Sequence, residues 1–313
     1  HGFWLSTLSK AARGDRLARG EEHAVAVKAQ APRLDRAMQG PAILQTVMAA
    51  CLDQVVANAG EIADGNRDDE MIHQLRVGLR RMRTAARELD SLCAGFEREW
   101  EAPVVAAFEA LGEYRDRDTV AQSIEAQLSA AGSPEPTLPP LHAAAPDPVG
   151  VVRDKDFQCA LLDALRFTLD PARSDPGAGP ALAPRAALRR IRSRLAKLHT
   201  LLKPSAKEFE QLDEAAQHRV RKRLKRLRYL AELVGPLHET AKVERYLDKL
   251  RPAQDALGAH IDLLVGLKMA GEAANHGDAQ AWFNVGWLTA QLSASARRCS
   301  RSLARASAAR RFW

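Results

Sequence analysis

Two stretches of this sequence share one frame: HQLRVGLRRMR at residues 73–83 and HRVRKRLKRLR at residues 218–228. The second stretch follows the first by 145 residues, and both keep basic and apolar residue types at the same positions. A second pair of motifs has almost the same spacing, because Leu111-Gly112 with Asp116 recurs 146 residues later as Leu257-Gly258 with Asp262. Two independent motifs with one spacing indicate an internal duplication.

Each frame has the periodicity of an amphipathic helix. At about 100° per residue, Leu75, Leu79 and Met82 fall on one side of the helix and Arg76 and Arg80 on the other. We therefore predict one buried side and one cationic side in each copy, with Arg81 and Arg226 pointing elsewhere. The cationic side carries His73, Arg76, Arg80, Arg83 and Arg87 in the first copy, and His218, Arg221, Lys225 and Arg228 in the second.

The cationic sides predict an anion-binding site. Exposed helix faces usually mix signs, whereas these stripes contain no Asp or Glu, so that like charges on successive turns repel one another. A bound anion would compensate that repulsion, and a solvated face is the alternative. Arginine suits phosphate because its planar fork bridges two oxygens. A third stripe, Arg190, Arg194 and Lys197, is equally compatible with an exposed face.

The histidines that begin the two stripes have two interpretations. A lone helical histidine is usually a packed or capping residue, but His73 and His218 occupy the same place in both copies. If they donate to phosphate as imidazolium, affinity rises as the pH falls through about 6.5. Asp116 and Asp262 are expected to cap helices or orient an arginine.

Composition favours a polyanionic partner and excludes several classes of protein. The formal net charge is +7, and residues 185–228 alone carry fifteen basic and four acidic side chains. No apolar run approaches the roughly 18 residues that span a bilayer, so no membrane segment is expected. The four cysteines lie far apart without a CxxC pair. This pattern predicts no metal site, no cofactor and a cytoplasmic protein.

The chain is expected to be all-α after a short N-terminal segment. Residues 1–40 fit a short strand and a linker, and the helical region divides into halves at about 41–132 and 150–313. A proline-rich stretch at 133–149 separates the halves, and a second one at 171–184 forms a loop within the second half. The predicted helices lie near 41–59, 67–94, 98–131, 151–169, 185–202, 207–234, 239–273 and 278–308.

The duplicated frame resembles the CHAD family, the conserved histidine α-helical domain. The resemblance covers about residues 41–313 and includes Leu111-Gly112 with the following Arg115-Asp116-Arg117-Asp118, Asp255-x-Leu257-Gly258, and the terminal Arg310-Arg311-Phe312-Trp313. It implies a duplicated helical bundle with pseudo-two-fold symmetry. It also implies that the basic helices face a central groove or pore that binds inorganic polyphosphate, with polyphosphate granules as a place of action.

Residues 1–40 resemble the tail and linker of proteins that join a triphosphate-tunnel (CYTH) domain to CHAD, notably at Leu8 to Gly14. The Glu-x-Glu-x-Lys triplet of those catalytic domains is absent from this sequence. We therefore expect a module that binds polyphosphate without catalysis. The alternatives are an accessory module of a triphosphate or polyphosphate hydrolase and a nucleic-acid-binding protein. Nucleic acid is disfavoured because aromatic residues, on which bases stack, make up only 5% of the chain.

Overall fold

The structure, a computed structural model, describes residues 3–21, 23–134, 136–139, 146–169, 181–279 and 281–313. These ranges contain helices and no β-strand, which confirms the predicted all-α class. The α-helices are α1 (Lys10–Ala18), α2 (Gly40–Ala63), α3 (Asp69–Glu88), α4 (Glu101–Ala130), α5 (Pro148–Arg153), α6 (Lys155–Leu169), α7 (Pro184–Thr200), α8 (Leu202–Glu208), α9 (Glu214–Val234), α10 (Thr240–Asn275) and α11 (Ala281–Ser307).

The two basic frames form α3 and α9, and the duplication extends to the caps of these helices. The carboxylate of Asp68 accepts a hydrogen bond from the backbone N–H of Met71 at 3.0 Å, and Asp213 accepts one from Ala216 at 2.6 Å. An aspartate at the N-cap satisfies a backbone donor that the first turn leaves without a partner. Since both caps are also 145 residues apart, the two helices begin at the same point of the repeat.

The buried sides of α3 and α9 are those that the periodicity predicts. On α3, Leu75, Leu79 and Met82 are fully buried. On α9, Leu224 and Leu227 are at most 1% exposed. Removing such side chains from water contributes about 1.5–3 kcal/mol each, so the apolar stripe fixes the rotation of each helix about its axis. The cationic stripe is thereby placed on the other side.

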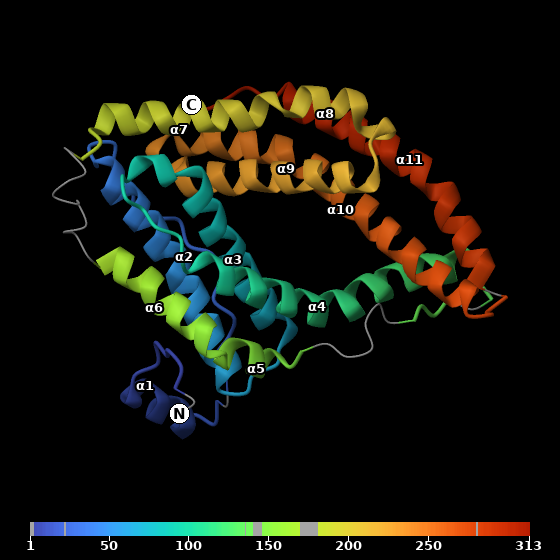
Figure 1. Cartoon of the computed structure of the whole chain (residues 1–313), viewed down its shortest axis with the longest axis horizontal. Coiled ribbons are helices and arrows are strands. Elements are labelled where there is room, and N and C mark those ends of the chain that lie inside the picture. The colour runs from blue at the N-terminus through green and yellow to red at the C-terminus, as the bar shows by residue number, and fades with distance from the viewer. Residues whose placement is uncertain (1–2, 22, 135, 140–145, 170–180, 280) are drawn as a thin grey trace. The chain divides into compact units, whose positions relative to one another are not determined.

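The chain forms two compact units by its contacts. Unit 1 comprises His1–Arg115 and Ala145–Arg192, and unit 2 comprises Asp116–Ala144 and Ser193–Trp313. These units differ from the expected halves, because α5 and α6 pack with the first unit. The physical reason is that α2 is apolar around most of its circumference and contacts α3, α5 and α6 (Figure 1). The pseudo-two-fold symmetry and the central groove stay predictions.

Helix α2 is the core helix of unit 1. It is long and apolar enough to cross a membrane by length and composition alone, but 61% of its most apolar window is buried inside the protein. Phe157 and Leu161 of α6 are buried in the same unit. Protein contacts therefore cover much of the apolar surface of α2.

The N-terminal segment differs from the expected strand and linker. It contains the short helix α1, and its extended part pairs with side chains of α2. The side-chain amide of Asn58 bonds both the N–H and the carbonyl oxygen of Val27, at 3.0 and 2.9 Å. Glu61 accepts from the N–H of Ala24 at 3.0 Å and bridges Arg16 at 2.6 Å. Polar side chains of α2 thus provide the hydrogen-bond partners that a neighbouring strand would give to this extended backbone.

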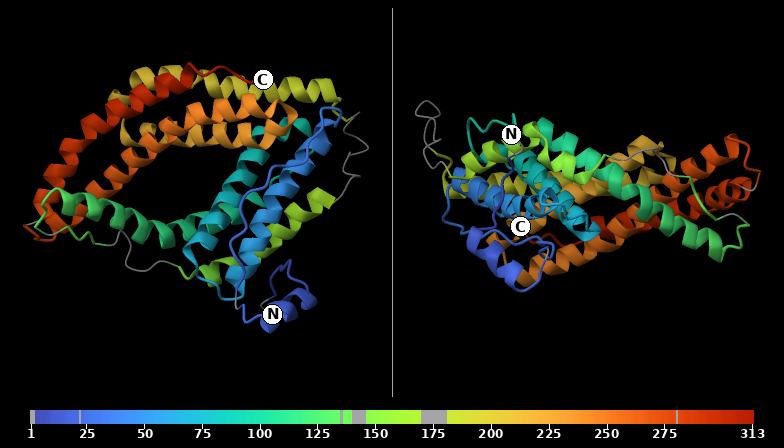
Figure 2. Two further views of the ribbon diagram at one scale, coloured as in Figure 1. Left: turned by 180° about the vertical axis from the view of Figure 1, so that it is seen from behind. Right: turned by 90° about the horizontal axis from the view of Figure 1, so that it is seen from below.

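In unit 2, α10 and α11 lie side by side along their lengths, as both views of Figure 2 show. The second half of α4 packs against them through Ile124 and Leu128, which form a core cluster with Met269 and Leu288. Gly266 permits this approach, since a Cβ there would lie 2.9 Å from the Ile124 side chain.

Two further regions differ from the predicted helices and loops or lie partly outside the described residues. The predicted helix 207–234 is interrupted at Phe209–Gln211, a short 3-10 turn, because the N-cap Asp213 begins a new helix. The proline-rich stretches fall partly at residues 135, 140–145 and 170–180, which lie outside the described residues.

Candidate anion site on the duplicated basic helices

In unit 1, three arginines of α3 gather around one aromatic ring of α4. The guanidinium carbons of Arg76, Arg80 and Arg83 lie 5.1, 4.9 and 5.8 Å from the centre of the Phe108 ring. Cations within about 6 Å of a ring face are attracted by its quadrupole. We name these four residues the arginine cluster. The ring gives the three like charges a shared partner and limits the positions that they sample.

The Leu111-Gly112 motif has a steric role in this cluster. A Cβ at residue 112 would lie 2.8 Å from Nη2 of Arg76 and 3.3 Å from its Cζ. Glycine therefore leaves the space that the guanidinium of Arg76 occupies. Phe108 lies one helical turn before Gly112, on the same face of α4. Phe108 is not among the site residues predicted from the sequence, although its spacing of four residues from Gly112 is a signal that places it on the same face of the helix.

The stripes are less free of acids than the sequence suggests. Arg83 lies 3.8 Å from a carboxylate oxygen of Glu101 on α4. Arg228 pairs with Glu232, one turn further along α9, at 2.6 Å. Burial lowers the pKa of Arg83, and Glu101 opposes that shift. Protein carboxylates therefore offset part of the repulsion at these two arginines, and the bound anion stays a prediction.

The remaining residues of the first stripe are placed differently from one another. His73 is half-buried, and Arg87 is exposed in the last turn of α3. Arg81 lies outside the stripe, as predicted. It is 3% exposed and donates to the side chain of Gln54 and the carbonyl oxygen of Gln30. Arg81 therefore joins α3 to α2 and to the N-terminal segment.

In unit 2, the second stripe borders an open cavity of about 490 Å³ between α4, α9, α10 and α11. We name it the α9 cavity. Position 254, which corresponds to Phe108, is glutamine, and its Oε1 is buried without a hydrogen-bond partner among the described residues. A Cβ on Gly258 would meet nothing within 4 Å, in contrast to Gly112. The cavity is lined by, among others, Arg221, Lys225, Gln254, Asp255, Gly258, Asp262 and Arg298.

The two copies therefore use the same frame for different local arrangements. In unit 1, arginines cover an aromatic ring, whereas in unit 2 Arg221 and Lys225 border open space. Asp262 lines this cavity together with Arg221 and Lys225, and its role in capping a helix or orienting an arginine stays a prediction. The side chain of Asp116 lies outside the described residues. Within the described part of the chain, no group of three His, Cys, Asp or Glu side chains is arranged to hold a metal ion.

The third predicted stripe, on α7, is not one surface of a single unit. Arg190 belongs to unit 1, is exposed, and donates to the backbone carbonyl of Ser91. Arg194 is half-buried and Lys197 exposed, and both belong to unit 2. Arg190 therefore has a structural partner within unit 1.

Replacing Phe108 tests whether the ring positions the arginine cluster. Phe108→Leu keeps apolar volume but removes the quadrupole, which is worth about 0.5–2 kcal/mol per contact. We expect polyanion affinity to fall roughly three- to tenfold, since less restrained arginines lose more entropy on binding. Phe108→Tyr retains the ring and serves as the matched control in an equilibrium titration. Equal affinities for the leucine and tyrosine variants would contradict this role.

His218 provides a test based on pH. Burial, followed by the charges of Lys222 and Arg221, lowers the pKa of His218. The imidazole is therefore neutral at pH 7, and a bound anion would raise its pKa. Affinity should then rise as the pH falls, and the rise should continue below about 6.5 rather than being centred there. Titrations between pH 8 and 5 should show a weaker dependence for His218→Gln; an unchanged profile would exclude His218 from binding.

Comparison with known proteins agrees with this fold. The crystal structure of the CHAD domain from the plant Ricinus communis has a TM-score of 0.69 and 23% sequence identity, over 89% of this chain and 96% of that chain. No curated protein matches the sequence. The family profile of the CHAD domain matches residues 46–270, which is more than two thirds of the chain. This protein therefore belongs to the CHAD domain family.

Proposed function

We propose that this protein binds inorganic polyphosphate through the basic faces of α3 and α9, without hydrolysing it. The observation that carries the proposal is the convergence of Arg76, Arg80 and Arg83 on the ring of Phe108. The corresponding positions of the second copy supply Arg221 and Lys225 to an open cavity. The CHAD family is associated with polyphosphate binding in general, which supports this ligand.

The chemistry of the ligand suits these side chains. Polyphosphate is a flexible chain of linked anions, so its affinity comes from many charge-assisted hydrogen bonds and from release of counterions. Arginine forks bridge two phosphate oxygens, while a lysine such as Lys225 acts as a mobile point charge. The guanidinium groups of the three arginines cover the ring of Phe108, so this ring is not offered to a nucleic-acid base for stacking. This arrangement favours a phosphate chain over a nucleic acid.

A competition experiment separates the two polyanions. Labelled polyphosphate is bound to the protein at one salt concentration and then displaced with either unlabelled polyphosphate or duplex DNA of equal phosphate content. We expect polyphosphate to compete at a lower phosphate concentration, because the DNA helix holds its phosphates at fixed positions. A preference for DNA would overturn the proposal.

The absence of catalysis is proposed and has its own test. Phosphoryl transfer needs metal-holding carboxylates or a positioned base beside the cations. Asp255 and Asp262 line the α9 cavity, but no three His, Cys, Asp or Glu side chains of the described residues are grouped to hold a metal ion. Incubation with tripolyphosphate and Mg²⁺ or Mn²⁺ is expected to release no phosphate. Steady, enzyme-dependent release would assign hydrolysis to this chain. We also propose a cytoplasmic location at polyphosphate granules, which a fluorescent fusion would reveal by co-localisation.

A further inference from the structure

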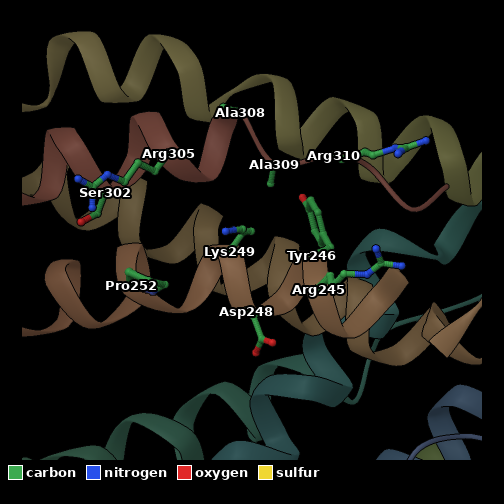
Figure 3. Close-up of a pocket in the computed structure, with 10 residues that line it drawn as sticks. All are labelled: Arg245, Tyr246, Asp248, Lys249, Pro252, Ser302, Arg305, Ala308, Ala309 and Arg310. Carbon is green, nitrogen blue, oxygen red and sulfur yellow. The ribbon is translucent and has the colours of Figure 1, made fainter. Parts of the chain in front are cut away.

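A second cationic cavity lies in unit 2, outside the basic stripes of α3, α7 and α9. It has a volume of about 610 Å³ and is walled by α10, the end of α11 and the C-terminal residues that follow α11 (Figure 3). We name it the C-terminal cavity. Its cations are Arg245, Lys249, Arg305 and Arg310. In the view of Figure 3, Lys249 lies between Arg305 on one side and Arg245 with Arg310 on the other.

The C-terminal cavity has a larger excess of positive charge than the α9 cavity. Its lining contains these four cations and one carboxylate, that of Asp248, which already accepts a hydrogen bond from Arg251 at 2.9 Å. By comparison, the α9 cavity has three cations and two carboxylates in its lining. Among the described residues, no carboxylate oxygen lies within 4.0 Å of a side-chain nitrogen of Lys249 or Arg305. The unbalanced charge is therefore +3 in the C-terminal cavity and +1 in the α9 cavity.

Aromatic packing fixes the wall that the C-terminal residues provide. The ring of Tyr246 lies 5.3 Å from that of Phe312 and 5.2 Å from that of Trp313. The Tyr246 hydroxyl is also 2.9 Å from Nδ1 of His199. Edge-to-face rings at such distances add to the stabilisation from burial. The last residues are thus held against α10, and Arg310 is kept beside the cavity.

A polar stripe of α11 passes from one cavity to the other. Ser295 and Arg298 line the α9 cavity, and Ser302 and Arg305 line the C-terminal cavity. Their spacings of three, four and three residues place them on one face of the helix. At a rise of about 1.5 Å per residue, Arg298 and Arg305 are roughly 10 Å apart along the axis. A linear ligand that follows this face would meet both cavities in succession.

We infer that the C-terminal cavity is a second phosphate-binding site and that one linear polyphosphate chain occupies it together with the α9 cavity. The inference rests on the proposed function, and it adds a length requirement. A chain that spans both cavities gains from the high effective concentration of its second segment, whereas tripolyphosphate is too short to do so. The two cavities of unit 2 would therefore bind long polyphosphate chains more tightly than short ones.

The test compares two double variants that lose the same charge. Lys249→Gln with Arg305→Gln removes cations of the C-terminal cavity, while Arg297→Gln with Lys268→Gln removes an exposed arginine of α11 and an exposed lysine of α10 that line neither cavity. We expect the first pair to weaken binding of long polyphosphate about tenfold relative to the control pair. The slope of log affinity against log salt should also become shallower by about 1.4, or roughly 0.7 per lost contact.

The outcomes separate this inference from the proposed function. Equal effects of the two double variants, with wild-type protein binding polyphosphate normally, would overturn the second site and leave the α3 and α9 site in place. Failure of the wild-type protein to bind polyphosphate would overturn both. The single variant Arg305→Gln, with its helical circular dichroism compared with wild type, guards against a folding defect in the double variant. The supporting result is that the double variant and the single Arg305→Gln variant both lose more affinity for long polyphosphate than for tripolyphosphate.

Discussion

Replacing Arg80 or Lys225 by glutamate is expected to weaken polyphosphate binding by roughly thirtyfold or more, which corresponds to about 2 kcal/mol. Arg80 lies 4.9 Å from the centre of the Phe108 ring, and Lys225 lines the α9 cavity. Each change removes one attraction and adds one repulsion at the place where phosphate is proposed to bind. Both residues are half-buried and lie on the side of their helix away from the apolar stripe, so the substitutions leave the buried sides of α3 and α9 unchanged.

The controls for these reversals are exposed cations of the same units. Arg166→Glu on α6 and Lys268→Glu on α10 change the net charge equally but lie outside the arginine cluster and the α9 cavity. Affinity would be measured by equilibrium titration, and helicity by circular dichroism. If Arg80→Glu and Lys225→Glu bind as well as their controls, the wrong helix faces have been assigned. If only one of them weakens binding, a single copy of the repeat carries the site.

Raising the salt concentration from 50 to 200 mM is expected to reduce polyphosphate affinity about fiftyfold. This figure assumes four phosphate contacts and a slope of about −0.7 for each, as for a flexible single strand. The four contacts are counted for the α3 and α9 frames alone, two from each, by Arg76 and Arg80 and by Arg221 and Lys225; contacts in the C-terminal cavity would make the slope steeper. The carboxylates of Glu101 and Glu232 neutralise part of the charge of Arg83 and Arg228.

Variants of the two carboxylates sharpen the salt prediction. Glu101→Gln and Glu232→Gln should each make the slope steeper, since the released arginine gains a phosphate contact. Fluorescence titrations at four salt concentrations would measure the slopes. An affinity that is independent of salt would contradict binding by charge, and a slope unaffected by either glutamine would show that these ion pairs do not limit the neighbouring arginines.

Much of the local structure could be predicted from the sequence. The spacing of Leu75, Leu79 and Met82 predicted the buried face of α3, and all three are fully buried. The equal spacing of the two frames predicted the duplication, and the N-caps Asp68 and Asp213 begin their helices at matching positions. These features depend on residues within a few turns of one another, so helical periodicity and capping are sufficient to reveal them.

The contacts between helices were not predictable in the same way. Phe108 and Glu101 are distant in sequence from the arginines that they contact, and nothing in the basic frames indicates them. The assignment of α6 to unit 1 likewise follows from its packing on α2. The C-terminal cavity combines residues of α10 and α11 that are fifty or more positions apart. Such contacts depend on how apolar faces pack, which periodicity alone leaves open.

The sequence by itself determined that this protein is helical, duplicated and cationic along one side of two matching helices. The tertiary structure decided what those cations meet. In unit 1 they cover the ring of Phe108, and in unit 2 they border a cavity beside Gln254. The reason is that amphipathicity sets which side of a helix is buried, through the free energy of removing apolar surface from water. The identity of the neighbouring side chain depends on the packing of helices that the chain brings together from distant positions.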